Sequence, residues 1–435
     1  MLIYLEKFAF YLFIFCLPFQ TRKILYQWGN AFNEWTTAYL YFTDILLLLI
    51  FVLWFWRLRK ERFLKNIGIG WFKDKIKSPN FWLVVFLLTS FISLSQTKNI
   101  QLGFYHWFKL LELFGLFFYL KYNFRQFFNF EQLAKIFIAS GLIQSIISII
   151  QYAGQKSIGL KFLAESPLSL EIPGVANFAS NGVKIIRSYG TLPHPNVLAV
   201  FLFVSIFFLY FLWLRKPHSF IKNCLFLIIF YPLLLALFLT FSRIIIFVFL
   251  LSSLIFFALC FRRHKKKVFA LLCLLVILCS IFVFLILPEI YSRFSFSLEE
   301  SSVNLRIFYN QTAFSVISEI PWLGLGIGNF VWGIKQVFIF LPSWAHQPIH
   351  NLYLLIAVET GLVGLFLFLF FIWRQIVLLY YSDKSLSRIL FFLIIFSFLF
   401  IALFDHFFWT LQQGQLVFWL VLGIMAGYSC IKRAP

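Results

Sequence analysis

The sequence predicts an all-α polytopic integral membrane protein of about 12 transmembrane helices, with a large extracytoplasmic loop between helices 9 and 10. Three observations support this fold class. Of the 435 residues, 62% are hydrophobic and only 12% are charged, whereas soluble domains are about one quarter charged. Apolar runs of about 18 or more residues, long enough to cross a bilayer, recur along the chain. The 64 phenylalanines are spread over these runs, so residues 1–435 are expected to form a single membrane domain.

The apolar runs give the predicted helices in chain order. They lie near residues 5–20, 36–56, 80–96, 103–121, 132–153, 194–214, 222–240, 243–261, 267–287, 350–372, 387–404 and 414–431. The first run is expected to be a retained helix, because no small-residue cleavage site follows it. Only a few residues up to Arg243 separate the seventh and eighth helices, which predicts a tight hairpin.

The basic residues orient these helices. Most of the 37 Lys and Arg residues fall in alternate connections, with clusters in residues 57–77, 215–222, 262–267 and 374–388. The positive-inside rule places these connections and the N-terminus in the cytoplasm. The net charge of +21 therefore reflects membrane topology. The expected partner is the lipid bilayer and not nucleic acid.

Two long connections then lie outside, at residues 154–193 and 288–349. The first ends in the motif RSYGTLPHPN. The second contains an amphipathic stretch, Asn304 to Ile320, which predicts a short helix along the membrane surface. Its Gly324-x-Gly-x-Gly sequence lacks a preceding strand, so a dinucleotide loop is a weak interpretation. A tight, close-packed turn is expected instead.

Several ionisable residues fall on the outer side, in loops or at helix ends. They are Arg187, His194, Arg243, Arg306, His350, Asp405 and His406. Outer connections are otherwise poor in basic residues, so these arginines are not part of the topological signal. An arginine fork grips phosphate bidentately, and several beside the bilayer would suit a pyrophosphate with a hydrocarbon tail. The alternative for any single arginine is snorkelling or contact with a lipid head group.

His350 is the strongest single candidate. A neutral imidazole at the start of a helix could take a proton from an attacking hydroxyl or orient a phosphate; the alternative is a capping or interfacial histidine. Asp405 could orient His350 or an arginine, or could simply form a helix-end pair with His406. Glu359 falls on the opposite side of the helix from His350 and is expected to pack between helices.

Other polar features give weaker signals. The six cysteines have no paired spacing and are expected to be apolar packing residues. The sequence contains no metal-binding motif, so neither a metal nor another cofactor is expected. His106, Lys109 and Glu112 share one helix within the membrane, where ionisable residues are functional candidates. They favour either mutual pairing or a proton-coupled transporter.

Five stretches resemble the O-antigen ligase and polymerase superfamily of bacterial envelope glycan enzymes. They are RSYGTLPHPN (187–196), LTFSR (239–243), NLRIFYNQTAFSVISEIPWLGLGIGNF (304–330), HNLYLLIAVETGLVGL (350–365) and the aspartate of FDHFFW (404–409). The first five helices match that superfamily only in hydropathy.

The resemblance implies a GT-C-like, inverting, metal-independent glycosyltransferase that works without a cofactor at the outer face of the bacterial inner membrane. The donor would be a glycan on undecaprenyl pyrophosphate. The acceptor would be a lipid in a ligase or a growing glycan in a polymerase; a protein hydroxyl is a further possibility. The implied roles are pyrophosphate binding by Arg243 and Arg306, base or activator for His350, support by Asp405, and assistance by Arg187 and His194. A transporter is the alternative from another class, but the repeated broken helices typical of transporters are missing.

Overall fold

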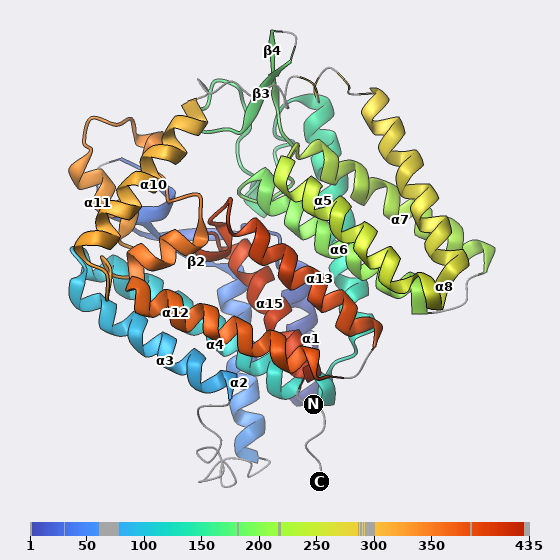
Figure 1. Cartoon of the computed structure of the whole chain (residues 1–435), viewed down its shortest axis with the longest axis horizontal. Coiled ribbons are helices and arrows are strands. Elements are labelled where there is room, and N and C mark those ends of the chain that lie inside the picture. Colours follow the sequence, from blue (N-terminus) through green and yellow to red (C-terminus); the bar gives the residue numbers. More distant parts are fainter. Residues whose placement is uncertain are drawn as a thin grey trace.

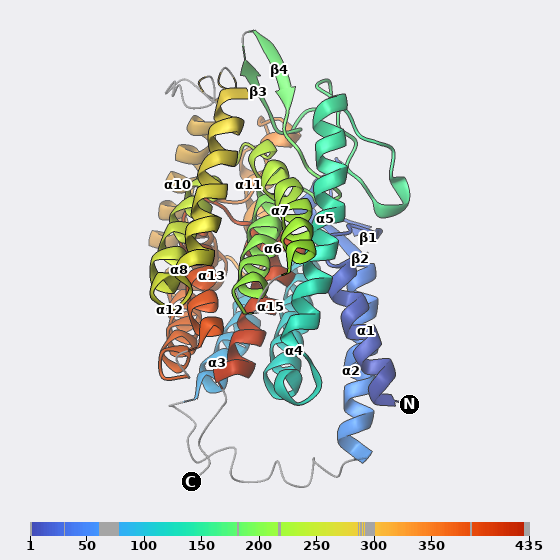
Figure 2. The same cartoon turned by 90° about the vertical axis from the view of Figure 1, so that its right-hand side faces the viewer.

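The computed structural model describes residues 2–29, 31–60, 78–180, 182–215, 219–285, 301–382 and 385–429, together with residues 287, 289 and 291. Within these ranges the chain is mostly helical, with two small antiparallel hairpins. Figure 2 shows the start of α1 and the end of α15 at one end of the bundle, and the β3–β4 hairpin at the other. An even number of crossings, as predicted, requires this arrangement of the two ends.

The N-terminal part contains α1 (Leu2–Cys16), β1 (Arg22–Gln27), β2 (Thr37–Tyr41) and α2 (Phe42–Lys60). The predicted helix at 36–56 was wrong at its start, because Thr37–Tyr41 pairs as a strand with β1. The β-branched and aromatic residues of TAYLY favour a strand. The side chain of Asp44 then accepts from the Tyr41 amide at 2.9 Å, so the helix can begin only after this segment.

The middle of the chain builds the centre of the bundle. It contains α3 (Pro79–Ile92), α4 (Ile100–Phe127), α5 (Phe130–Gly154), β3 (Asn177–Ser180), β4 (Val183–Ile186), α6 (Pro195–Arg215), α7 (Phe220–Leu239) and α8 (Arg243–Leu285). Helix α6 is the central one, since 89% of its most apolar 18-residue window is buried. It contacts α5, α7, α8, α13 and α15.

Helix α8 combines two predicted helices. It runs from Arg243 to Leu285 with a single non-helical residue, His264, and Figure 1 shows the two halves diverging at a bend. The bend coincides with the basic run 262–267 that separated the two apolar segments in the sequence. The expected tight hairpin before α8 is present, and Phe241 adopts a positive φ of 46° there.

The C-terminal part contains α10 (Ser301–Glu319), α11 (Phe330–Val337), α12 (Leu352–Tyr380), α13 (Leu386–Ile401), α14 (Phe407–Thr410) and α15 (Gln412–Ser429). Helix α10 confirms the predicted helix at 304–320, and it packs on α12. Helix α15 makes its most extensive contact with α4. A Cβ at Gly423 would lie 2.7 Å from the Leu120 side chain, so this glycine permits close approach of the two backbones.

Six of the described helices are long and apolar enough to cross a membrane: Pro79–Gln96 (α3 with its 3₁₀ extension), α5, α6, α7, α8 and α12. The all-α membrane class is thus supported, while twelve crossings remain a prediction. Helices α1, with 15 residues, and α13, with 16, fall below the length of these six. Helices α2 and α4 carry buried charges, and Arg57 of α2 pairs with Glu6 of α1 at 2.8 Å. Burying a charge requires such a partner.

A break in α12 receives the glycine turn before α11. Gly361 has a φ of +75° inside α12, and the amides of Leu325 and Leu362 donate to Val358 and Pro321 carbonyls at 2.8 and 2.7 Å. A Cβ at Gly361 would lie 1.9 Å from the Trp322 carbonyl oxygen. This confirms the expected close-packed turn and shows why only glycine fits there.

Candidate active site

A chain of hydrogen bonds links three segments that are far apart in the sequence and were predicted to lie on the outer side. The buried guanidinium of Arg187 donates from Nε to the Thr240 carbonyl at 2.6 Å and from Nη2 to Asn196 Oδ1 at 2.8 Å. Asn196 Nδ2 then donates to Asp405 Oδ2 at 2.6 Å. Asn196 is therefore the link between Arg187, after β4, and Asp405, between α13 and α14.

Three histidines surround this chain. The backbone amide of His406 donates to Asp405 Oδ1 at 2.8 Å, and the His406 ring contacts the His350 ring edge-on, with centroids 5.1 Å apart. His194 lies at the start of α6, where its Nδ1 accepts from the Asn196 amide at 3.2 Å. The connections before α6, α12 and α14 thus bring His194, His350 and His406 to one place.

Helix α10 covers this group from one side. Tyr309 is fully buried, its hydroxyl donates to the Ala345 carbonyl, and its ring stacks on His350 with centroids 6.4 Å apart. Arg306 lies one turn earlier on the same helix, where residues three apart are neighbours, and it is exposed. Its positive charge lowers the pKa values of His194, His350 and His406. Arg306 therefore faces the histidine group.

Burial has the largest effect on the pKa values of the three histidines and Asp405, which lie outside the six apolar spans. Burial, reinforced by neighbouring positive charges, lowers the pKa of His350 to about 3 and that of His194 to about 3. Burial alone would raise the pKa of Asp405, but His406, His350, His194 and the Asn196 amide hold it below its ordinary value of 3.8. At neutral pH the site therefore combines an ionised carboxylate with neutral imidazoles.

One ring nitrogen of His350, Nδ1, is buried without a hydrogen-bond partner among the described residues. The following residue, Asn351, caps α12 by accepting from the Tyr353 and Leu354 amides at 3.0 and 3.1 Å. Asn351, and not His350, therefore caps this helix. A buried polar atom without a partner is unusual and calls for an explanation, such as a catalytic role or an unseen ligand.

Arg243 approaches the site from a different element. It begins α8, directly after the turn whose Thr240 carbonyl accepts from Arg187. The side chain is half-buried. The contacts described above join Arg187, His194 and Asp405 through Asn196, and His350 to Asp405 through His406. Arg306 acts through its charge, and the α7–α8 turn brings Arg243 to their neighbourhood.

Sequence reasoning missed four contributors, Asn196, Tyr309, Trp35 and the central position of His406. The Trp35 ring lies edge-on to the His406 ring at 6.0 Å. Asn196 was visible as the last residue of RSYGTLPHPN, but its role depends on a contact with a segment 209 residues away. Tyr309 could not be recognised from the sequence, because it resembles the apolar residues on the buried face of α10.

Two of the three residues predicted within the membrane, Lys109 and Glu112, pair outside this site. Lys109 pairs with Asp44 of α2 and lies 3.6 Å from Glu112. The same Asp44 accepts from Gln412 Nε2 at 2.6 Å. The Lys109–Glu112 pairing is present, and Asp44 ties α2, α4 and α15 together. The network therefore resembles a structural ion cluster rather than the proton pathway of a transporter.

Across the described ranges, no group of three or more His, Cys, Asp or Glu residues is placed to hold a metal ion.

The comparison with protein families adds one finding. Residues 224–369 match the family model Wzy_C, whose description is O-antigen ligase. This segment of the chain is similar to the O-antigen ligase family. This match confirms the predicted resemblance to the O-antigen ligase and polymerase superfamily. No curated protein matches the chain.

The matched segment contains three of the predicted site residues, Arg243, Arg306 and His350. Arg187, His194 and Asp405 lie outside the matched residues and complete the group through the hydrogen bonds of Asn196. The match supports a function of the ligase or polymerase type.

Proposed function

We propose that this protein transfers a glycan from undecaprenyl pyrophosphate to an acceptor hydroxyl at the outer face of the bacterial inner membrane, as an O-antigen ligase-like glycosyltransferase. The observation that carries the proposal is the position of His350. Its ring contacts His406, whose amide donates to the Asp405 carboxylate, and the charges of Asp405 and Arg306 act on it. It also lies within the segment that matches the O-antigen ligase family model.

In the proposed reaction, the acceptor oxygen attacks the anomeric carbon of the first sugar of the donor. The bond from that carbon to the pyrophosphate oxygen breaks, and the pyrophosphate keeps the electron pair. The acceptor proton passes to a ring nitrogen of His350. A single displacement of this kind inverts the configuration at the anomeric carbon.

The arginines supply positive charge where negative charge develops. Arg306 and Arg243 are the proposed pyrophosphate ligands, since guanidinium forks match phosphate oxygens and stabilise the leaving group in the transition state. In this proposal, they take the role that a metal ion has in other phosphate-leaving reactions. Arg187 and His194 position the site through Asn196.

Donor binding also explains how a histidine with a pKa of about 3 can act as a base. Part of that lowering comes from positive neighbours, including Arg306. A pyrophosphate would neutralise Arg306 and add negative charge, and both changes favour the protonated imidazole. His350 would therefore become a stronger base only when the donor is in place. Asp405 would stabilise the imidazolium and is proposed as a supporting catalytic group.

The decisive experiment compares cells carrying wild-type, His350→Ala and His346→Asn proteins at equal membrane expression. His346 is the matched control, because it is a buried histidine in the same loop whose ring bonds to the Phe338 carbonyl. We expect His350→Ala to accumulate undecaprenyl-linked glycan and to lose surface polymer, while His346→Asn does neither.

The product distinguishes the two acceptor classes. Donor-linked units that remain short would indicate a polymerase, whereas full-length polymer that stays on the lipid carrier would indicate a ligase. Normal surface polymer in His350→Ala would contradict the proposal. If Glu112→Gln instead abolished a substrate flux, the transporter alternative would replace it.

A further inference from the structure

A polar cavity lies at the predicted cytoplasmic end of the bundle. It has a volume of about 310 Å³ and is lined by residues from α4, α6, α13 and α15 and from the end of α12. Three arginines contribute to it, namely Arg125 at the end of α4, Arg215 at the end of α6 and Arg388 in the first turn of α13. None of its described lining residues is acidic; Asp383 and Lys384 lie outside the described residues.

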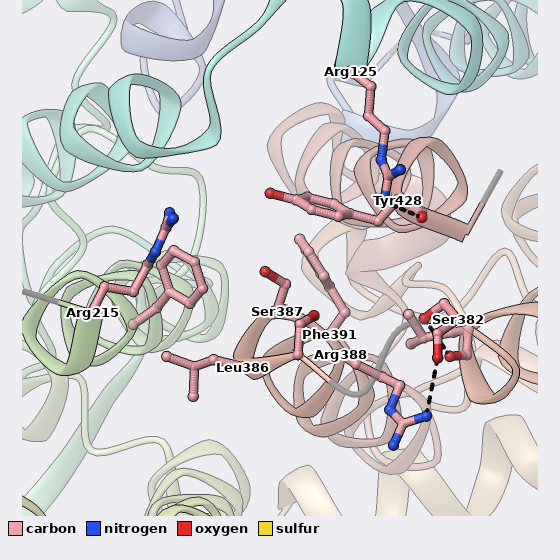
Figure 3. A pocket seen from close by; sticks show the side chains of 11 residues that line it. Arg125, Arg215, Ser382, Leu386, Ser387, Arg388, Phe391 and Tyr428 are labelled. Carbon is pink, nitrogen blue, oxygen red and sulfur yellow. Dashed lines mark hydrogen bonds between the residues drawn. The ribbon is translucent and has the colours of Figure 1, made fainter. Parts of the chain in front are cut away.

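Figure 3 shows how these side chains are held. Arg125 donates to the Tyr428 carbonyl at 2.9 Å, and its guanidinium lies 5.4 Å from the centre of the Tyr428 ring. Arg215 lies on the other side of that ring, with its guanidinium 5.3 Å from the centre of the Phe211 ring. The Tyr428 hydroxyl points toward the Arg215 side, and Ser387 lies between them and α13.

Arg388 has a different role. Its Nη1 donates to the Tyr380 and Ser382 carbonyls at 2.9 and 3.2 Å, so it fastens the end of α12 to α13. The same helix start offers an anion-attracting element, because Ser385 at the N-cap makes no side-chain capping bond. The first amides of a 16-residue helix therefore add their dipole to the charges of the arginines.

We propose that this cavity binds the phosphate group of an anionic phospholipid from the cytoplasmic leaflet, with Arg125, Arg215 and the hydroxyls of Tyr428 and Ser387 as ligands. The apolar members of the lining, Phe211, Leu379, Leu386 and Phe391, suit the glycerol and upper acyl carbons of a lipid better than free phosphate. The positive-inside signal alone requires basic residues near the membrane, not a cavity with converging hydroxyls and a helix start. The site is independent of the glycan transfer proposed at the opposite end.

Native mass spectrometry of the full chain in detergent tests this proposal, with phosphatidylglycerol, phosphatidylcholine or inorganic phosphate added. Wild-type protein should retain one phosphatidylglycerol in preference to phosphatidylcholine. The double variant Arg125→Gln/Arg215→Gln should bind it at least about tenfold more weakly, as expected for losing two basic contacts to an anionic headgroup. Arg59→Gln is the matched control, since Arg59 is an exposed arginine on a phenylalanine ring at the same end of the bundle.

Three outcomes would overturn the proposal. They are equal phosphatidylglycerol retention in the double variant, equal retention of phosphatidylcholine by the wild type, and an equal loss in Arg59→Gln. Inorganic phosphate that binds alone and displaces the lipid would overturn the lipid assignment and indicate a free-phosphate site. Should the double variant fold poorly, Arg215→Gln alone suffices, because Arg215 is exposed and has no hydrogen bond among the described contacts.

Discussion

Asn196 and Asp405 are separated by 209 residues, yet the Asn196 amide donates a 2.6 Å hydrogen bond to the Asp405 carboxylate. The same Asn196 accepts from Arg187 through its carbonyl oxygen. An amide is suited to this position because it can accept from a cation and donate to an anion at once. The bond fixes the connection between α13 and α14 against the start of α6, and with it the position of His406.

Replacing Asn196 by Ala tests this link. The change leaves the buried Arg187 and Asp405 without their shared partner, which costs about 1–3 kcal/mol for a buried polar group. If this free energy is lost from the positioning of the catalytic groups, the rate of glycan transfer should fall by about 10- to 100-fold. In vitro transfer with purified protein measures it.

Asn80→Ala serves as the control for that measurement, since the Asn80 amide donates to the Tyr122 hydroxyl at the opposite end of the bundle. It should leave transfer unchanged. Wild-type activity in Asn196→Ala would mean that the Arg187–Asn196–Asp405 chain has no part in positioning the site.

Arg306→Gln tests the proposed pyrophosphate contact. Removing one charged donor to a leaving oxyanion costs about 10²–10³ in rate in comparable sites, and we expect a loss of that order. Arg306→Lys should restore part of it, because lysine keeps the charge but not the fork. Because Arg306 is exposed, neither change should alter the melting temperature.

Lys335→Gln is the matched control for Arg306. Lys335 is another cation of the 288–349 segment, but its Nζ donates to the Thr36 hydroxyl at 3.2 Å. Equal losses in Arg306→Gln and Lys335→Gln would point to a general surface-charge effect, and no loss in Arg306→Gln would remove it from the mechanism.

The protonation of His350 predicts an unusual pH profile. An ordinary histidine, with a pKa of 6.5, gains its proton below that pH, whereas His350 holds its neutral form down to about pH 3. The rate at limiting donor reports the free enzyme, so it should stay level between pH 7.5 and about 5.

At saturating donor the expected sign is opposite. The bound pyrophosphate raises the pKa of His350, and the acid limb of the rate should move to higher pH than at limiting donor. Transfer assays over this range, at both donor concentrations, measure the difference. An acid limb near pH 6.5 at limiting donor would show that His350 is not buried in the way described.

Gly361→Ala tests the break in α12. Alanine at a φ of +75° is strained, and its Cβ would lie 1.9 Å from the Trp322 carbonyl oxygen, so we expect a loss of about 3 kcal/mol or more in stability. Gly159→Ala is the control, because Gly159 has a φ of +99° but nothing within 4 Å of an added Cβ.

The control should cost only about 1–2 kcal/mol, the strain of a left-handed residue. Melting temperature in detergent, followed by tryptophan fluorescence, compares the two. If both variants lost the same amount, the packing of the glycine turn into α12 would contribute nothing to stability.

The positions of the helices could be predicted because each depends mainly on its own segment. The run 197–214 is apolar apart from Ser205, and its burial at the centre of the bundle follows from that composition. The predicted helix at 36–56 failed at its start for the opposite reason. Whether Thr37–Tyr41 forms a strand depends on its partner β1, and a hydropathy pattern does not describe partners.

The candidate site was predictable in its residue types and not in its contacts. Topology alone separated Arg187, Arg306 and Asp405 from the basic residues that orient the helices. It did not reveal Asn196, whose role appears only where the start of α6 meets the connection between α13 and α14. It also could not foresee that Lys109 would pair with Asp44 of another helix.

The sequence by itself determined a helical membrane protein, the order of its apolar segments and the set of ionisable residues at the ends of those segments, because hydrophobicity and charge act within each segment. Only the tertiary structure decided which of those residues meet. Hydrogen bonds and ring contacts act over about 3 to 6 Å, so the pairing of Asn196 with Asp405, and of His350 with His406, depends on how helices distant in the chain pack together.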